Sequence, residues 1–442
     1  MNTDKLFAAA SAAGIAPFEA RFHKESRLSI SMFNTELENL TVAENGSVKV
    51  RGLVDGKCGV FTSDRTDDEV IDMAVKAVKE AAAYGQPVDP EFFISGDAYE
   101  YEQLATCNGD LACCPTETFI SVARRVAEAT LAADKRIECV ETSLEYVCVD
   151  RELLNSNGLK LMSSNNYVML YASAKVVDGE EIESGMHYEL LRSLDAFDCK
   201  KFTGELVKKT VGQLGGKSVA SGTYSVVYSP DCVAPLMAAI VNGFSAFSVE
   251  QHVSLLEGKV GNKIFSDSLT VEQTPIGVDP FCRAFDDEGV PCKNSTLIDK
   301  GVPTGYVYDL ATAKRAGCAS TGNGRLLGDN MRPDIDYVTI RAGEKTLPEL
   351  FEAVGNGLYI TNIAGVHAGL NPMSGAYSLQ ASGYLIENGK VSRPVSLITV
   401  AGNIMTDFAD IIAVGADTTL TYYGVKTPSI AVRNLSVSGK EQ

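Results

Sequence analysis

Residues 167–190 read YVMLYASAKVVDGEEIESGMHYEL, and this stretch decides the fold class. Its β-branched and alternating apolar side chains predict one strand over 167–177 and a second over 181–190. The dipeptide Asp178-Gly179 between them is typical of a β-hairpin turn, because both residues tolerate a left-handed backbone conformation. Consecutive strands joined in this way form an antiparallel meander rather than a series of βαβ units.

The same alternation of strands and turns extends to either side of this hairpin, and a few helices interrupt it. Further strands are predicted over residues 18–23, 27–33, 36–43, 47–54, 137–149, 159–163 and 223–228, with Asn45-Gly46 and Asn157-Gly158 among the turns. Helices are predicted over residues 3–13, 66–84 (capped by Thr66), 116–134, 203–214, 231–243, 346–354 and 403–413. The predicted fold class is therefore α+β: two lobes built on mixed, largely antiparallel sheets with a few packing helices.

A chain of 442 residues is long enough for about two or three domains. We predict the boundary between residues 195 and 220, where the meander ends and a different pattern begins. The first domain covers residues 1–200 and contains a linker-like stretch, rich in Pro, Gly and acidic residues, at about 85–115. The second covers residues 215–442 and combines the central helix over 231–243 with a Gly-rich antiparallel sheet.

The charge and composition limit which binding partners and which cellular compartment we expect. Lys and Arg number 39 and Asp and Glu 57, which gives a net charge of −18. Such a field repels a polyanion, and no cluster of five basic residues offsets it, so we expect no direct nucleic-acid binding. No apolar stretch reaches the ~18 residues that cross a bilayer. The 11 cysteines at irregular spacings are typical of reduced thiols, so we expect a cytoplasmic protein without membrane contact.

Familiar catalytic motifs are absent from the sequence. Of the four histidines, the closest pair, His187 and His252, is 65 residues apart, which excludes a helix with paired zinc-binding histidines. The sequence also lacks a C-x-x-C pair and a G-x-S-x-G nucleophile elbow. His252 has acidic neighbours and His367 lies in a Gly-rich loop, so these two are candidates for a site, with a structural role as the open alternative.

Several longer stretches carry a family resemblance. They are residues 50–60, 217–230, 285–290, 313–323 and 357–403, and the last of these is the most specific. In this order they resemble the TldD/PmbA family of metallopeptidase-related proteins, whose members are also named modulators of DNA gyrase. The resemblance covers most of the chain. It implies a two-lobed fold and a dimer formed from a catalytic branch and a companion branch.

The resemblance also indicates the branch. In the catalytic branch the central helix carries HExxxH, and a cysteine near the C-terminus supplies a third zinc ligand. The matching positions here read MAAIVN, so Met237 and Asn242 stand in place of the histidines and Ala238 in place of the glutamate. The last cysteine is Cys318, which leaves no ligand near the C-terminus. The resemblance thus implies the PmbA/TldE-like branch, with no catalytic or metal site, no cofactor of its own, and zinc only in a catalytic partner.

For this branch the resemblance implies a companion subunit of a metallopeptidase complex that acts on unstructured peptides. Its partner would be an HExxxH-bearing TldD-like subunit or a second copy of the chain. An extended peptide adds to a sheet edge with few sequence requirements, so the Gly-rich segments 365–378 and 383–390 are candidates for a peptide groove. Plain tight turns explain these glycines equally well. The candidate groove residues are His252, His367, Gly365, Gly369, Asn371, Gly375 and Ser378.

Two other functions stay open. One is a homodimeric regulatory or peptide-binding protein with no peptidase activity, which the absence of an HExxxH relative from the same genome would favour. The other is an independent peptidase that uses Cys282, Cys292 or Ser320 as its nucleophile. The sequence places no general base beside any of these three side chains.

Overall fold

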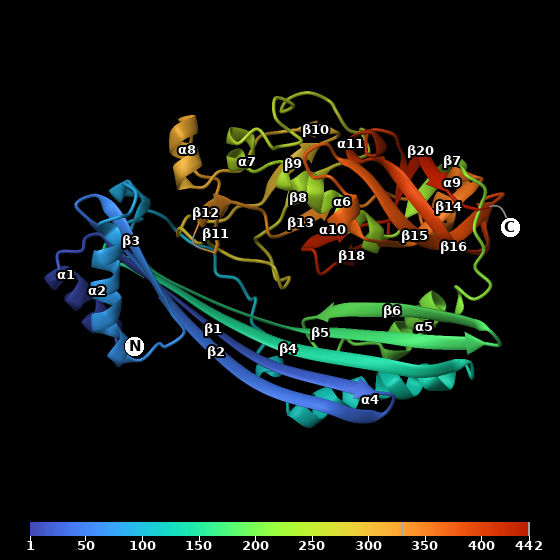
Figure 1. Ribbon diagram of the computed structural model, residues 1–442, viewed down its shortest axis with the longest axis horizontal. Helices are drawn as coiled ribbons and strands as arrows, with labels where there is room; N and C mark the ends of the chain where they lie inside the picture. The colour runs from blue at the N-terminus through green and yellow to red at the C-terminus, as the bar shows by residue number, and fades with distance from the viewer. Residues whose placement is uncertain (329, 441–442) are drawn as a thin grey trace.

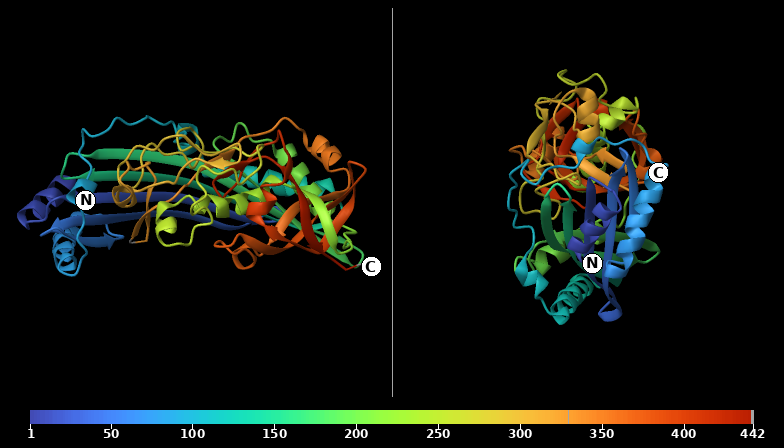
Figure 2. Two further views of the ribbon diagram at one scale, coloured as in Figure 1. Left: turned by 90° about the horizontal axis from the view of Figure 1, so that it is seen from above. Right: turned by 90° about the vertical axis from the view of Figure 1, so that its left-hand side faces the viewer.

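The computed structural model describes residues 1–328 and 330–440 and shows two parts of different build (Figure 1). One is a long curved sheet formed by strands β1 to β6. The other is a thicker assembly of shorter strands and helices, from residue 222 onward, which lies over one side of that sheet (Figure 2). No helix in the described residues is both long enough and apolar enough to cross a membrane.

The curved sheet has the order β3-β2-β1-β4-β5-β6, and every neighbouring pair is antiparallel. Its strands are β1 (Phe18–Phe33), β2 (Glu36–Val54), β3 (Lys57–Ser63), β4 (Ile137–Asn155), β5 (Lys160–Asp178) and β6 (Glu181–Leu191). The hairpin of β5 and β6 has the predicted turn, since Asp178 pairs with Glu181 and Gly179 has a φ of 65°. The predicted α+β class is confirmed.

Three of these strands each join two segments that were predicted as separate strands, because pairing continues through the residues between them. In β1 the predicted strands 18–23 and 27–33 are one strand. The predicted break at Asn45-Gly46 is wrong: Asn45 pairs with Glu25 and Gly46 with Lys24, inside β2. Likewise the predicted strands 159–163 and 167–177 are one strand, β5, which pairs with β4 along nearly its whole length. A continuous ladder satisfies the backbone groups of these residues and so overrides their local preference for a turn.

Helices cover one face of the curved sheet. They are α1 (Thr3–Ala12), α2 (Ile71–Ala82), α4 (Thr116–Ala133) and α5 (Cys199–Val211). Leu28 and Ile30 of β1 are buried with Phe119 of α4 on this face, whereas Glu19 and Arg21 lie on the opposite one. The prediction that Thr66 caps the second helix is wrong. Asp67 caps a short 3-10 turn that precedes α2, because its carboxylate accepts a hydrogen bond from the Glu69 N–H.

Five strands of the second part close into a small barrel. The sheet order is β16-β15-β14-β7-β20-β17, and further pairing of β16 with β20 closes the ring. The five strands of the ring are β7 (Gly222–Tyr228), β14 (Gly357–Ala364), β15 (Ala376–Glu387), β16 (Lys390–Asn403) and β20 (Ile430–Ser438), and β17 (Ile411–Val414) pairs with β20 outside it. The prediction of a helix over 403–413 is wrong beyond its first turn. Helix α11 (Ile404–Asp407) is short, because Ile411 already pairs with Val432 of β20.

A smaller sheet and several helices complete the second part. The sheet has the order β10-β9-β8-β13-β19-β18, and β11 and β12 form a separate hairpin. These strands are β8 (Val271–Gln273), β9 (Ser295–Asp299), β10 (Val302–Pro303), β11 (Gly324–Leu327), β12 (Asn330–Pro333), β13 (Val338–Ile340), β18 (Thr419–Leu420) and β19 (Val425–Thr427). The second part also contains the helices α6 (Pro230–Asn242), α7 (Ala246–Glu250), α8 (Leu310–Ala316), α9 (Leu347–Val354) and α10 (Val366–Gly369), whereas the short helix α3 (Gly109–Ala112) belongs to the first part and precedes α4. The division into domains 1–200 and 215–442 stays a prediction.

Candidate functional site

Helix α6 lies at the centre of the region where the two parts of the molecule meet. Ser229 precedes it, and Pro230 occupies its first turn, where the N–H that proline lacks has no helical partner anyway. Most of its side chains are apolar. Met237 and Ile240 are fully buried in a core shared by the barrel and the smaller sheet.

The predicted positions of the lost zinc motif do not share one side of α6. Met237 is 0% exposed and packs in the core, whereas Ala238 is half-buried and Asn242 is exposed. Asp231, Ala238 and Asn242 form a stripe along one side of the helix, because residues that are seven and four positions apart lie on the same side of an α-helix. This stripe, which does not include Met237, is the less buried side of α6, although Ala238 still packs against the edge of the core.

A cavity of about 390 Å³ lies between the curved sheet and the first turns of α6. Side chains of β5, β6 and α5 line it from one part of the molecule, and those of α6, residues 361–366 and residues 422–423 line it from the other. In Figure 1 this is the region where β5 and β6 pass below α6 and β18. We call it the inter-sheet cavity.

A polar cluster forms part of the wall of the inter-sheet cavity. Tyr188 Oη donates a hydrogen bond to Asp231 Oδ1 at 3.0 Å, and Lys209 Nζ donates to Asp231 Oδ2 at 2.9 Å. Behind Lys209, His187 Nδ1 lies 3.4 Å from the ammonium nitrogen, and His187 Nε2 lies 3.7 Å from Glu189 Oε1. Burial and the neighbouring Asp231 carboxylate raise the pKa of Tyr188, so its hydroxyl keeps the proton that it donates.

The residues present on this side of α6 do not fit a zinc ion. Ala238 has no donor atom, Met237 faces the core, and both oxygens of the Asp231 carboxylate already accept hydrogen bonds. More generally, the described residues contain no group of three or more His, Cys, Asp or Glu side chains placed to hold a metal ion.

The three suggested nucleophiles have unsuitable surroundings. Burial raises the pKa of Cys282 to about 11 and also raises that of Cys292, so both are neutral thiols near pH 7. Ser320 Oγ donates to the backbone oxygen of Tyr308 at 3.1 Å. Among the described residues, none of the three hydrogen-bonds to a histidine. The arrangement does not support an independent cysteine or serine peptidase.

Five of the predicted groove residues lie together at α10 and the segment that follows it. Gly369, Asn371 and Ser378 line an open hollow of about 610 Å³, and Gly365 and His367 are exposed beside it at α10. The hollow is shallow and faces solvent. These residues are therefore available to a ligand, although none of them belongs to the inter-sheet cavity.

The other two predicted groove residues are placed differently. Gly375 is buried, with a φ of 74°, and a Cβ atom there would lie 3.5 Å from Leu255 Cδ2. His252 lies in another loop, where it is exposed and its Nδ1 is 2.7 Å from Glu257 Oε1. The positive φ of Gly375 meets the demand of a tight turn, which was the alternative explanation for these glycines.

The predicted loop over 383–390 is a hairpin instead. Residues up to Glu387 belong to β15, and Asn388-Gly389 forms the turn into β16 with positive φ at both positions. Gly383 lies inside β15, where a Cβ atom would come within 1.9 Å of the Tyr359 oxygen. Glycine is required there for close approach of two strands rather than for contact with a ligand.

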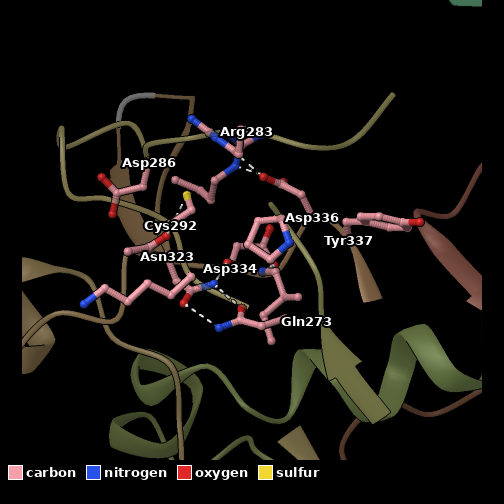
Figure 3. Close-up of a pocket in the computed structure, with 13 residues that line it drawn as sticks. Gln273, Arg283, Asp286, Cys292, Asn323, Asp334, Asp336 and Tyr337 are labelled. Atoms are coloured by element: carbon pink, nitrogen blue, oxygen red, sulfur yellow. Dashed lines mark hydrogen bonds and ion pairs between the residues drawn. The ribbon is translucent and has the colours of Figure 1, made fainter. Parts of the chain in front are cut away.

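A second polar region, which we call the junction cluster, surrounds the stretch 285–290. Arg283 Nη1 lies 3.2 Å from Asp336 Oδ2, as Figure 3 shows. Its Nη2 lies 2.6 Å from Asp287 Oδ1. Asp286 accepts hydrogen bonds from the backbone N–H groups of Glu288 at 2.9 Å and Gly324 at 2.7 Å. The cavity among these side chains has about 20 Å³, which is room for about one water molecule.

Charges from the curved sheet meet this cluster. Arg51 donates to both carboxylate oxygens of Glu19, at 2.8 and 3.1 Å, and both residues lie on the sheet face turned toward the second part. Burial and the neighbouring Asp286 raise the pKa of Glu288, so this carboxyl group tends to keep its proton. Tyr101 Oη donates to the backbone oxygen of Gly289 at 2.7 Å. Phe285 and Val290 of this stretch are buried together with Leu153 and Leu161 of the curved sheet, so the junction cluster lies where the second part packs on the sheet.

Three consecutive segments of the chain match the models of one protein family. The PmbA/TldA metallopeptidase domain 1 matches residues 18–82, the central domain matches residues 109–214, and the C-terminal domain matches residues 221–439. The chain belongs to the PmbA/TldD metallopeptidase family. The predicted family resemblance is confirmed.

Individual members of the PmbA/TldD family are similar along nearly the whole chain. The metalloprotease PmbA of Escherichia coli O157:H7 is 24% identical, over 96% of this chain and 92% of its own. The structure of a candidate modulator of a DNA gyrase from Thermotoga maritima is 28% identical, with a TM-score of 0.89 and 99% of each chain covered. TldE from Thermococcus kodakarensis has the same fold, with a TM-score of 0.90 at 21% identity, over 99% of this chain and 100% of that one.

The inter-sheet cavity of this PmbA/TldD-family chain was missed by the sequence analysis. Tyr188, Lys209, Gln213 and Asp231 come from separate elements, and none of them lies in a recognisable motif. A lysine and an aspartate 22 residues apart carry no spacing signal until the fold is known. Only the apolar character of α6 pointed to this region.

Proposed function

We propose that this chain is the companion subunit of a TldD/PmbA-type metallopeptidase complex that acts on unstructured peptides, and that it lacks a zinc site of its own. The observation that carries the proposal is the partly exposed stripe of α6. Ala238 and Asn242 stand at two positions where a zinc peptidase needs a carboxylate base and an imidazole, and Asp231, two turns before Ala238, is held by Lys209. Membership of a metallopeptidase family supports a role in such a complex.

The free edge of β2 supports assembly with another chain. β3 pairs with β2 only over residues 48–54, so in the described structure no strand pairs with the outer side of residues 36–47. Leu40 and Val42 on this segment are 42% and 75% exposed. An unpaired edge with exposed apolar side chains readily adds a strand from another chain, either a TldD-like subunit or a second copy.

The extended peptide would contact the hollow beside α10. Gly369, Asn371 and Ser378 line this hollow, and His367 is exposed at its rim. A surface without buried charge and with backbone groups near solvent suits peptides of varied sequence, because recognition then depends on the main chain. The role proposed for this chain is to hold such a peptide while the partner supplies the zinc-dependent chemistry.

Purification from the native host tests the complex. We expect an HExxxH-bearing relative to co-purify in equal amount, as measured by mass spectrometry, and the isolated chain to contain far less than one zinc per chain by elemental analysis. One tightly bound zinc per isolated chain would overturn the assignment to the companion branch.

Light scattering tests the assembly. We expect the isolated chain to form a dimer that buries more than ~1,500 Å² and that exchanges into a mixed dimer with an HExxxH relative. Val42→Lys should weaken pairing, whereas Tyr84→Lys, at a residue that is 92% exposed elsewhere, should not. A 47.2 kDa monomer that stays monomeric with the relative present contradicts the companion role. A stable homodimer that never takes up the relative would favour a regulatory or peptide-binding protein.

A further inference from the structure

The inter-sheet cavity has the lining of a ligand site, and nothing in the proposed companion role assigns it a ligand. We propose that it binds a neutral internal segment of a peptide, with one aromatic side chain of that segment inserted among Tyr188, Tyr422 and Tyr423. The choice of a peptide as the ligand rests on the proposed function. The lining of the cavity supports an aromatic and uncharged ligand without reference to the proposed function.

Three tyrosine rings form a ladder along one side of the cavity. The rings of Tyr188 and Tyr422 are 5.2 Å apart at 62°, and those of Tyr422 and Tyr423 are 4.4 Å apart at 30°. Tyr422 and Tyr423 are 47% and 42% exposed, so each keeps a large part of its surface available. An aromatic ligand would continue this ladder, since offset and edge-to-face ring pairs are favourable beyond the area that they bury.

The charges in the cavity cancel each other. Lys209 and Asp231 are the only charged side chains that line it among the described residues, and they are bonded to one another at 2.9 Å. A free amino acid would bring an ammonium and a carboxylate group that find no counter-charge here, and their desolvation would oppose binding. A residue inside a peptide carries amide groups instead, which matches a neutral site.

Polar groups suited to amides line the remaining wall. Gln213 is 7% exposed, and its Oε1 atom has no hydrogen-bond partner, while its Nε2 lies 3.5 Å from the Gly383 oxygen. A buried acceptor without a donor is costly, and a ligand N–H in the cavity would satisfy this oxygen once the Gln213 side chain turned toward the open volume. Thr361 and Asn362 lie on the same wall, just beyond Ile360, where the pairing of β14 with β7 ends.

The size of the cavity agrees with this ligand. Its volume of about 390 Å³ lies within the range of about 300–1,000 Å³ that is usual for small-molecule sites. It therefore accommodates one large side chain with the adjoining main chain, but not a folded domain.

Titration calorimetry with the full chain alone tests the proposal, because it needs no partner subunit. The probes are acetyl-Ala-Phe-Ala-amide, acetyl-Ala-Ala-Ala-amide and free phenylalanine. We expect saturable binding of acetyl-Ala-Phe-Ala-amide and binding of the other two probes that is at least roughly tenfold weaker. Acetyl-Ala-Ala-Ala-amide lacks the ring contacts, and free phenylalanine must desolvate its two charged groups.

Two variants locate the binding in the cavity. Tyr423→Ala removes one ring of the ladder and should lower the affinity for the phenylalanine peptide roughly tenfold. Ser184→Trp places a bulky group at the exposed mouth and should abolish binding. Tyr84→Ala, at a tyrosine that is 92% exposed and distant from the lining, is the matched control and should bind as the unmodified chain does. Thermal unfolding of each variant confirms that it is folded.

The outcomes separate this proposal from the companion role. No saturable binding of the phenylalanine peptide, or binding that Tyr423→Ala and Ser184→Trp leave unchanged, overturns the aromatic site even if an HExxxH partner co-purifies. Equal binding of all three probes overturns the preference for a neutral aromatic residue. Binding with the expected pattern in a chain that has no peptidase partner supports the site and removes the companion role.

Discussion

The two parts of the molecule meet in two regions of opposite character. In the junction cluster, Arg283, Asp287 and Asp336 are packed so closely that the space among them holds about one water molecule. In the inter-sheet cavity, one ion pair between Lys209 and Asp231 borders an open volume of about 390 Å³. The first region is closed by ion pairs within the second part, beside residues that pack on the curved sheet, whereas the second region keeps the open volume in which we propose that a ligand binds.

The largest expected effect comes from removing the central cation of the junction cluster. Arg283→Met leaves the buried Asp287 and Asp336 with Arg325 as their remaining cation, and removing one partner of a buried ion pair costs about 3–5 kcal/mol. Urea unfolding measures the loss. The control is Arg341→Met, because Arg341 pairs with Glu272 at the surface and should contribute less than about 1 kcal/mol. Equal losses of unfolding free energy for the two variants would show that the junction cluster contributes no more to stability than a surface ion pair.

Histidine substitutions on the two sides of α6 should differ nearly as much in their effect on the free energy of unfolding. Met237→His buries an imidazole in an apolar core and should lower the free energy of unfolding by about 2–4 kcal/mol. Asn242→His changes an exposed residue of the same helix and should alter it by less than about 0.5 kcal/mol. The measurement is again urea unfolding. A well-tolerated histidine at 237 would show that this side of α6 can reach solvent.

The pH dependence of stability tests the protonated carboxyl group of the junction cluster. Burial and Asp286 raise the pKa of Glu288 in the folded state, so the folded protein binds more protons than the unfolded one above the ordinary value of 4.5. The stability that this group contributes is complete below that value and is lost as the pH rises through the raised pKa. Glutamine cannot titrate, yet it can still accept the Leu310 N–H bond.

Glu288→Gln should therefore lose less stability than the unmodified protein between about pH 5 and pH 8, by roughly 1–3 kcal/mol. Chemical unfolding at several pH values measures the difference. Parallel pH profiles would mean that Glu288 is ionised in the folded protein.

The smallest expected effect lies in the inter-sheet cavity. Lys209→Met leaves the partly buried Asp231 with Tyr188 as its remaining partner and should cost about 1–2 kcal/mol. In combination with Asp231→Leu the loss should be less than the sum of the single losses, because the two side chains interact. Lys175→Met, which breaks a more exposed pair with Glu138, is the control and should cost less than about 0.5 kcal/mol. Additive losses would show that the cavity pair is not coupled.

The wrong element boundaries at residues 45–46, at residue 383 and over residues 403–413 have one physical cause. Asn45-Gly46 and Gly383 resemble turns locally, but both lie inside strands whose partners extend past them. The helix predicted over 403–413 ends early because Ile411 finds a partner in Val432. Pairing between strands far apart in the chain thus overrides local preference, and a local pattern contains no information about it.

The candidate site shows the same limit. Gly369, Asn371 and Ser378 were predicted within one short segment and do line one hollow, because neighbours in a segment stay near each other in space. His252 was predicted with them on the strength of its acidic surroundings, but it lies in another loop and is bonded to Glu257. The predicted groove is therefore a local feature, and its function stays a proposal.

The sequence by itself determined the α+β class, the hairpin at Asp178-Gly179, the apolar helix α6 and the family, since each depends on periodicity or on motifs read along the chain. Only the tertiary structure decided that Met237 is buried while Asn242 is exposed, and that Tyr188, Lys209 and Asp231 share one cavity wall. The physical reason is that burial and hydrogen bonding depend on which distant segments pack together. Those contacts form only when the curved sheet and the barrel assembly close on α6.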